Sequence, residues 1–198
     1  MKITIFGAGG GEVTGSAYVV ESGKSKVLVD CGMFQGVSNA DQKNRIAQEF
    51  TFRNLVSVLI THAHLDHTGR LPILAQRRFA GSVYLTSATG ELTQLILKDA
   101  AKIQASDILR VNRRRQREGK QPLDPLYSME DVEEIVSRFR PVAYDKPVNV
   151  APNIEARWIE AGHLLGSASI ELTVNENGRK KVVMFSGDLG QQAAPSSN

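Results

Sequence analysis

The feature that most constrains this chain is a buried strand followed at once by a dense cluster of histidines. Val56–Thr61 (VSVLIT) is a continuous apolar run, which is typical of a strand covered on both faces. Directly after it comes His62-Ala63-His64-Leu65-Asp66-His67, which holds three of the four histidines of the chain. One histidine at a strand end is most often a surface or capping residue. Three histidines with a carboxylate between them indicate a functional site on the turn that leaves the strand.

The order of expected elements indicates the fold class. Expected strands are short, apolar and β-branched, and they cover residues 2–6, 17–21, 26–30, 56–61, 83–86, 154–159, 169–174 and 181–185. Asn177-Gly178 predicts a tight turn between the last two. A long helix is expected with Ser87 as its N-cap, and a second helix after Ser128. The second helix would share one apolar face among Val132, Ile135, Val136 and Phe139. The pattern predicts a mixed α/β sandwich with helices packed on a sheet.

Two later residues extend the histidine cluster. His163 lies in AGHLLGS (161–167), and Asp188 lies in SGDLG (186–190), after an apolar strand. Either residue alone would fit an ordinary turn, and both gain weight from the cluster. Imidazole and carboxylate groups suit a divalent zinc ion.

Six such groups are more than one tetrahedral ion can use, so the cluster predicts a two-metal site with ions about 3.5–4 Å apart. On the turn that leaves the strand, His62 and His64 can point to one side and bind one ion. Asp66 and His67 can turn to the other side and meet a second ion. Asp188 is then a natural bridge between the two. A hydroxide held between two ions would be ionised near neutral pH.

These motifs carry a family resemblance. H-x-H-x-D-H resembles the hallmark of the metallo-β-lactamase superfamily. Further strings resemble its β-CASP branch of RNA-processing nucleases, which includes relatives of the nuclease subunit of the cleavage and polyadenylation specificity factor. The strings are GEVTGS (11–16), VDCGMFQG (29–36), THAHLDHTGRLP (61–72), AGHLLGSA (161–168) and SGDLG (186–190). The resemblance implies the N-terminal part of a metallo-β-lactamase-type αβ/βα sandwich, with a mixed sheet and flanking helices.

The resemblance also implies roles for individual residues. The implied zinc ligands are His62, His64 and His163 for the first ion, and Asp66, His67 and a shared Asp188 for the second. Asp30 matches the first-motif aspartate of the family, which would orient the metal-binding loop. The alternative for Asp30 is a strand-end aspartate that caps a turn. Asp66 would also handle the proton of the nucleophilic water. The catalytic candidates are therefore Asp66 and Asp30.

The chain departs from the family pattern after its Gly-Asp-Leu-Gly motif. In the family, a second, β-CASP domain follows, with an acid and a leaving-group histidine, and a last histidine ligand comes later. Here no histidine follows His163. The resemblance therefore implies an incomplete metallo-β-lactamase domain over residues 1–190 and a disordered tail over 191–198, where the β-CASP domain would begin. The second metal site would be one ligand short, and this chain, read as an N-terminal fragment, would have reduced activity or none.

The expected function is zinc-dependent hydrolysis of RNA phosphodiester bonds by a metal-bound hydroxide. Two alternatives stay open: a hydrolase of the same fold that acts on an ester or thioester, and a zinc-binding fragment without turnover. RNA is the expected partner, and a homodimer of a longer parent is compatible with the resemblance.

Composition sets the remaining limits. The formal charge of +3 and the pI near 9.1 permit an acidic partner without demanding one. The arginine run over 110–117 could track phosphates, with Arg113, Arg114 and Arg115 as candidates. We favour a solvated helix end or loop, because no aromatic residues interleave with the arginines. A single cysteine, Cys31, cannot form an internal disulfide, which favours the reducing cytoplasm. No window approaches the ~18 apolar residues of a membrane span.

Overall fold

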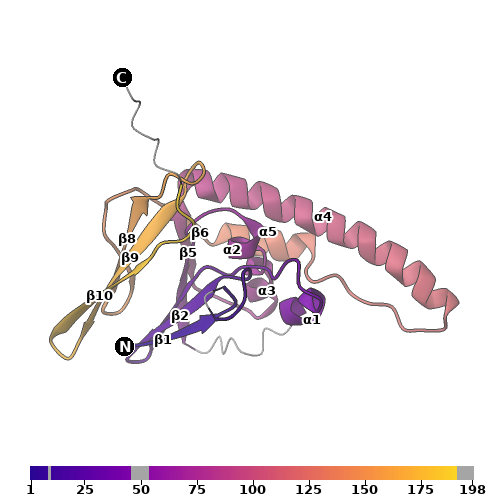
Figure 1. Ribbon diagram of the computed structural model, residues 1–198, viewed down its shortest axis with the longest axis horizontal. Coiled ribbons are helices and arrows are strands. Elements are labelled where there is room, and N and C mark those ends of the chain that lie inside the picture. Colours follow the sequence, from indigo (N-terminus) through magenta and orange to yellow (C-terminus); the bar gives the residue numbers. More distant parts are fainter. Residues whose placement is uncertain (9, 46–53, 191–198) are drawn as a thin grey trace, which may run out of the picture.

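The computed structural model describes residues 1–8, 10–45 and 54–190, so the expected tail over 191–198 lies outside the described residues. The elements form three layers: helices, a six-stranded sheet and a four-stranded sheet (Figure 1). This arrangement confirms the predicted mixed α/β sandwich with helices packed on a sheet. Among the described residues, no helix is both long enough and apolar enough to cross a membrane.

The central sheet contains six strands in chain order. They are β1 (Lys2–Phe6), β2 (Ala17–Ser22), β3 (Ser25–Val29), β4 (Leu55–Leu59), β5 (Ser82–Thr86) and β6 (Phe139–Val142). The first three strands pair antiparallel, and β3 to β6 pair parallel. The carboxyl ends of the four parallel strands therefore meet at one edge of the sheet, where ligand sites of α/β folds lie.

The second sheet packs on one face of the central sheet. It is antiparallel in the order β10-β9-β8-β7, with β7 (Val148–Ala151), β8 (Ile154–Glu160), β9 (Ala168–Glu176) and β10 (Arg179–Phe185). Trp158 is fully buried between the sheets, and its indole N–H donates to the carbonyl oxygen of Ile60 at 3.1 Å. Asn177 and Gly178 both have positive φ, at 52° and 73°, which confirms the predicted tight turn.

The helices cover the other face of the central sheet. They are α1 (Ala40–Arg45), α2 (Leu65–Thr68), α3 (Leu71–Gln76), α4 (Ser87–Arg117) and α5 (Met129–Ser137). Besides the apolar core between the two sheets, another apolar core joins the helices to the central sheet. Ile60 and Leu85 lie on its sheet side, and Leu97 and Ile135 lie on its helix side. Burial of these aliphatic side chains, at ~25 cal/mol per Å² of apolar surface, is the main force that holds the helix layer in place.

Two sequence predictions at helix ends were wrong. The N-cap of α4 is Thr86, whose hydroxyl accepts a hydrogen bond from the Thr89 amide at 3.2 Å, and Ser87 is the first helical residue. Phe139 does not continue the face of α5, because the helix ends at Ser137, Arg138 is its C-cap, and Phe139 opens β6. The predicted start of α5 is confirmed, since Ser128 forms a reciprocal capping box with Asp131.

Candidate metal centre

Four strands deliver the candidate ligands and their support to one edge of the molecule. The central sheet supplies two of them, because β3 leads directly into Asp30 and β4 leads into the turn that carries His62. The second sheet supplies the others, because β8 ends just before His163 and β10 just before Asp188. Side chains that are up to 158 positions apart in the sequence thus share a site, as expected where strand ends converge.

The first group of donors fits one tetrahedral ion. His62, His64, His163 and Asp188 each offer one donor atom within 4.8 Å of the others. The Nδ1 atom of His64 lies 3.1 Å from Nε2 of His62 and 3.3 Å from Nε2 of His163. The Oδ2 atom of Asp188 lies 3.7 Å and 3.5 Å from the same two Nε2 atoms. Donors held at ~2.1 Å from one zinc ion lie about 3.4 Å apart, so these separations suit a single ion.

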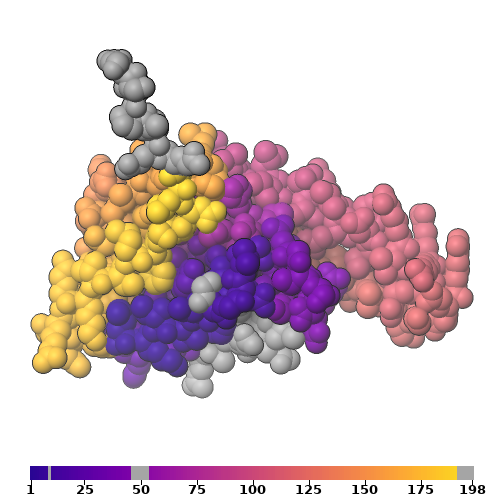
Figure 2. Space-filling model, viewed as in Figure 1, coloured from indigo at the N-terminus to yellow at the C-terminus, as the bar shows by residue number. Residues whose placement is uncertain are grey.

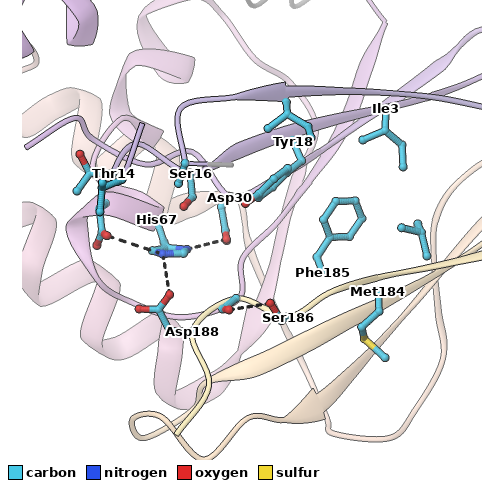
Figure 3. Close-up of a pocket in the computed structure, with 16 residues that line it drawn as sticks. Ile3, Thr14, Ser16, Tyr18, Asp30, His67, Met184, Phe185, Ser186 and Asp188 are labelled. Carbon is cyan, nitrogen blue, oxygen red and sulfur yellow. Dashed lines mark hydrogen bonds and ion pairs between the residues drawn. The ribbon is translucent and has the colours of Figure 1, made fainter. Parts of the chain in front are cut away.

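The second group lies on the other side of Asp188. Its Oδ1 atom is 3.5 Å from Nε2 of His67, and Oδ2 of Asp66 is 3.9 Å from that same nitrogen. Figure 3 shows the His67 ring between Asp188 and Asp30. One carboxylate therefore offers one oxygen to each group, which is the geometry of a bridging ligand. The structure brings all six sequence-predicted ligands together in the predicted partition, and their role as ligands stays a prediction.

Asp30 supports the histidine turn from below. Its side chain is 1% exposed, and Oδ2 lies 2.8 Å from Nδ1 of His67. The same carboxylate accepts hydrogen bonds from the hydroxyl and the amide of Thr61, both at 2.9 Å. A proton on Nδ1 of His67, directed at Asp30, leaves Nε2 as the lone pair that faces Asp66 and Asp188. Asp30 thus orients a candidate ligand and also caps the strand end, so both sequence interpretations describe part of its contacts.

The surroundings shift the pKa of two candidate ligands, His62 and His67, in opposite directions. Burial, assisted by the neighbouring imidazoles, lowers the pKa of His62 to about 2. His62 is therefore neutral at any physiological pH, and the neutral imidazole is the form that binds metal. Burial by itself would lower the pKa of His67. The hydrogen bond to Asp30 and the negative charge of Asp30 outweigh this effect, so the pKa of His67 is above its usual value. The neutral imidazole of His62 is ready to bind a divalent cation, whereas at His67 the cation would have to displace a proton that is held more tightly than in a free histidine.

Two glycines let the loops of the centre meet at backbone distance. A Cβ atom on Gly32 would lie 1.6 Å from the carbonyl oxygen of Asp66, and one on Gly190 would lie 1.8 Å from the carbonyl oxygen of Gly162. The first contact holds the loop after β3 against the histidine turn. The second holds the Asp188 loop against the His163 loop. Any side chain at either position would push these loops apart.

Sequence reasoning missed two supporting residues. Thr61 is the partner of Asp30 described above. Arg70 is 4% exposed, its Nε donates to the carbonyl oxygen of Gly32, and its guanidinium lies 4.8 Å from the centre of the Phe34 ring. Both residues lie inside the string THAHLDHTGRLP, but only the fold shows what they contact. A cavity of about 640 Å³ beside His67, lined partly by Tyr18 and Phe185, was also not foreseen (Figure 3).

The arginine candidates lie elsewhere. Arg113, Arg114 and Arg115 belong to the last turns of α4, and this end of the helix projects away from the edge where the strand ends converge (Figure 1). The structure therefore does not bring them to the metal centre.

Comparison with known proteins decides the family. The sequence profile of the metallo-beta-lactamase superfamily matches residues 10–194. The chain belongs to this superfamily. Solved metallo-beta-lactamases agree in fold: the native FEZ-1 enzyme from Legionella gormanii has a TM-score of 0.56 at 12% identity over 99% of this chain and 63% of that one. SMB-1 bound to 2-mercaptoethanesulfonate has a TM-score of 0.52 at 22% identity over 94% of this chain and 62% of that one. At such identities the likeness shows the fold alone.

Curated relatives are more similar in sequence than these solved structures. Ribonuclease TTHA0252 from Thermus thermophilus is 37% identical over 97% of this chain and 38% of its own length. Transcription termination factor FttA from Pyrococcus abyssi is 35% identical over 94% of this chain and 28% of its own length. The factor of the same name from Cenarchaeum symbiosum is 31% identical over 95% and 27%. The chain thus spans less than two-fifths of the length of these curated relatives.

Proposed function

We propose that this chain carries the metal-binding part of a β-CASP-type ribonuclease, whose centre hydrolyses RNA phosphodiester bonds with zinc. The observation that carries the proposal is the position of Asp188, with one carboxylate oxygen toward His62 and His163 and the other toward His67. This arrangement suits two adjacent ions, which is the layout of many phosphodiesterase sites. The names of the curated relatives, a ribonuclease and termination factors, support RNA over an ester or thioester as substrate.

The residues of the chain would divide the work. Bound zinc would supply an ionised water and would stabilise charge on the phosphate. His62, His64 and His163 hold three nitrogens toward one position, while Asp30 fixes the orientation of His67. Asp66 is 26% exposed at its side chain and borders the cavity, so it can accept the proton of an attacking water.

We extend the proposal to a longer parent protein that would contain this chain. The second group has three donors among the described residues, and we propose that a further ligand from a longer parent completes it. This chain by itself would then hold the second ion weakly and cleave RNA slowly. A cytoplasmic location and a homodimeric parent remain part of the proposal, supported by the single cysteine and by the resemblance respectively.

A metal count combined with RNA cleavage tests the proposal. We expect saturating zinc to give two ions per chain, measured by inductively coupled plasma mass spectrometry, and hydrolysis of a labelled RNA. His62→Ala should weaken zinc binding about a hundredfold or more, because a structural zinc site of four ligands contributes ~10–16 kcal/mol. Asn149→Ala, an exposed position on β7, is the control. One ion and no cleavage in excess zinc would refute hydrolysis by this chain, and unchanged zinc content in His62→Ala would refute the ligand assignment.

A further inference from the structure

The long helix α4 has two different halves. Its buried residues are Thr89, Thr93, Leu97, Ala100 and Ala101, all in the first half. From Lys102 onward no residue of the helix is buried, and this half extends beyond the body of the protein (Figures 1 and 2). We call residues 102–120 the basic arm. Packing does not explain its composition, because the arm contributes nothing to either apolar core.

The basic arm concentrates the positive charge of the chain. It contains seven lysine and arginine residues and two acids, so its formal charge is +5. The whole chain carries +3, which leaves –2 for all other residues. The modest overall charge therefore conceals a strongly basic projection on a slightly acidic body. Such a separation of charge directs a polyanion to one part of the surface.

Four arginines share one face of the arm. Arg110, Arg113, Arg114 and Arg117 follow i, i+3, i+4 and i+7 spacing, so they project in nearly the same direction. The side chains of Arg110 and Arg114 are 77% and 84% exposed. We call these four residues the arginine face. From Arg110 to Arg117 the helix rises about 10 Å, which is the length of the arginine face.

The opposite face of the arm is occupied by the chain that returns from it. The Asn112 amide nitrogen donates to the carbonyl oxygen of Leu123 at 2.9 Å, and its Oδ1 accepts from the Leu123 amide at 2.8 Å. Nε of Arg115 donates to the carbonyl oxygen of Gln121 at 2.6 Å. We call residues 121–123 the return segment. Arg115 of α4 therefore holds the return segment in place and is not part of the arginine face. This contact also fixes which face of the arm is open to a partner.

Acidic residues neutralise only part of the arginine face. Asp107 lies 3.8 Å from Arg110, and Glu118 lies 3.0 Å from Arg114. Within the described parts of the chain, Arg113 and Arg117 have no carboxylate at ion-pair distance. Exposed pairs of this kind are weak and are easily exchanged for a phosphate.

We propose that the arginine face binds the phosphate backbone of an RNA strand whose other end reaches the metal centre. The inference rests on the proposed function and names a second contact surface for the same substrate. The first turn of α4 lies beside the centre, because the Thr89 hydroxyl donates at 2.8 Å to the carbonyl oxygen of Gly166, three residues after His163. From Thr89 to Arg113 the helix rises about 36 Å. At ~3.4 Å per stacked nucleotide, about ten nucleotides span this length.

The composition of the arm also predicts the mode of binding. Residues 102–120 contain no aromatic side chain, so the arm offers no platform for base stacking. Contacts would be to phosphates, and binding would be insensitive to sequence and sensitive to salt. The exposed apolar side chains of Ile103 and Leu109 make a second copy of this chain the competing occupant, and the experiment below separates it from RNA.

The experiment compares two triple variants of equal charge. Arg113→Gln, Arg114→Gln and Arg117→Gln together remove three cations from the arginine face. Arg179→Gln, Lys180→Gln and Lys181→Gln together remove three exposed cations from β10, and both variants have a formal charge of zero. Binding of a fluorescein-labelled, unstructured thirty-nucleotide RNA is measured by anisotropy in EDTA, from 50 to 300 mM salt. Circular dichroism checks that the helix content of each variant equals that of the wild type.

We expect the arm variant to bind about 10- to 100-fold more weakly at 0.1 M salt. The slope of log affinity against log salt should fall by about 2, since each phosphate contact with a single strand contributes ~0.7. The β10 variant should retain most of the affinity and the slope. Equal losses in the two variants, or an unchanged slope in the arm variant, would overturn the proposal. Dimer dissociation by the arm variant alone in sedimentation velocity, with RNA binding intact, would assign the face to a second copy instead.

Failure of the arm proposal can be distinguished from failure of the proposed function. Hydrolysis of the small phosphodiester bis(p-nitrophenyl) phosphate by the wild-type chain with zinc tests the centre without engaging the arm. Hydrolysis combined with unchanged RNA binding in the arm variant would leave the proposed function standing and refute the arm. Absence of hydrolysis, combined with weaker RNA binding by the arm variant, would refute the centre as a phosphodiesterase and keep the arm as a surface that binds RNA.

Discussion

The metal centre and the basic arm both gather charged side chains, but they are built in opposite ways. The centre draws its residues from the ends of four strands and from both sheets, and its histidines are held in place by buried partners such as Asp30. The arm draws its arginines from one helix, and the ion pairs of Arg110 and Arg114 are exposed. In the centre each residue depends on the whole fold, whereas in the arm spacing along a helix is sufficient.

This contrast predicts how the two regions respond to change. A site assembled from distant segments loses its geometry when one support is removed. A row of exposed arginines should lose affinity in proportion to the number of charges removed. The predictions below compare matched changes in the two regions.

The largest contrast concerns thiol reactivity. Burial is the main reason that the pKa of Cys31, next to Asp30, is raised from 9.0 to about 12. Because the thiolate is the reactive form, a rise of three units lowers reactivity at pH 8 about a thousandfold. Reactivity should therefore appear only as the pH approaches 12 or when the chain unfolds. In the variant Gln116→Cys, which adds a thiol on the arm, we expect Ellman's reagent to modify one thiol quickly. Rapid modification of two thiols in the folded protein would contradict the packing around Cys31.

The second contrast uses one substitution twice in the same helix. Leu97 is fully buried in the first half of α4, and Leu109 on the arm is 61% exposed. Leu97→Ala should lower the free energy of unfolding by about 2–5 kcal/mol, because it leaves a cavity in the core. Leu109→Ala should change it by less than about 0.5 kcal/mol. Urea unfolding followed by circular dichroism measures both, and similar losses in the two variants would show that the arm is packed against something in solution.

The third contrast compares two carboxylates. Asp30→Asn keeps the shape of the side chain but removes the charge beside His67, and we expect zinc affinity to fall about 10- to 100-fold. Asp107→Asn on the arm, where the side chain is 62% exposed, should leave zinc affinity unchanged. Competition with a fluorescent zinc chelator measures both affinities. An Asp30→Asn variant with the affinity of the wild type would remove Asp30 from the support of the centre.

Much of the centre was predictable because its residues follow strands with strong apolar patterns. His62 and Asp188 each follow such a run, so their approach to a common edge could be expected. The fold class followed from the same runs. The shared position of Asp188 was also predicted, but the distances from its two oxygens to the two donor groups depend on how the two sheets pack. Short elements with weak patterns were also missed, among them β6, which contains Pro141, and β7.

The arm shows a different limit of sequence reasoning. The arginine run over 110–117 was visible, but its three candidates could not be sorted. Helical spacing alone places Arg113 and Arg114 near Arg110. That Arg115 instead binds the carbonyl oxygen of Gln121 can be known only from the path of the return segment. The prediction of a solvated helix end agrees with the structure, because Arg113 and Arg114 are exposed in the last turns of α4. The grouping of four arginines on one face required the observation that α4 continues to Arg117.

The continuity of α4 has a mechanical consequence. The carbonyl oxygen of Gly166 accepts hydrogen bonds from the hydroxyls of both Thr86 and Thr89, so the first turn of this helix is fastened to the loop that carries His163. A single helix of 31 residues without an internal proline behaves as a rod clamped at one end. The direction of the arm is therefore set at the rim of the metal centre. A pull on the far end acts as torque on the loop that holds a candidate ligand.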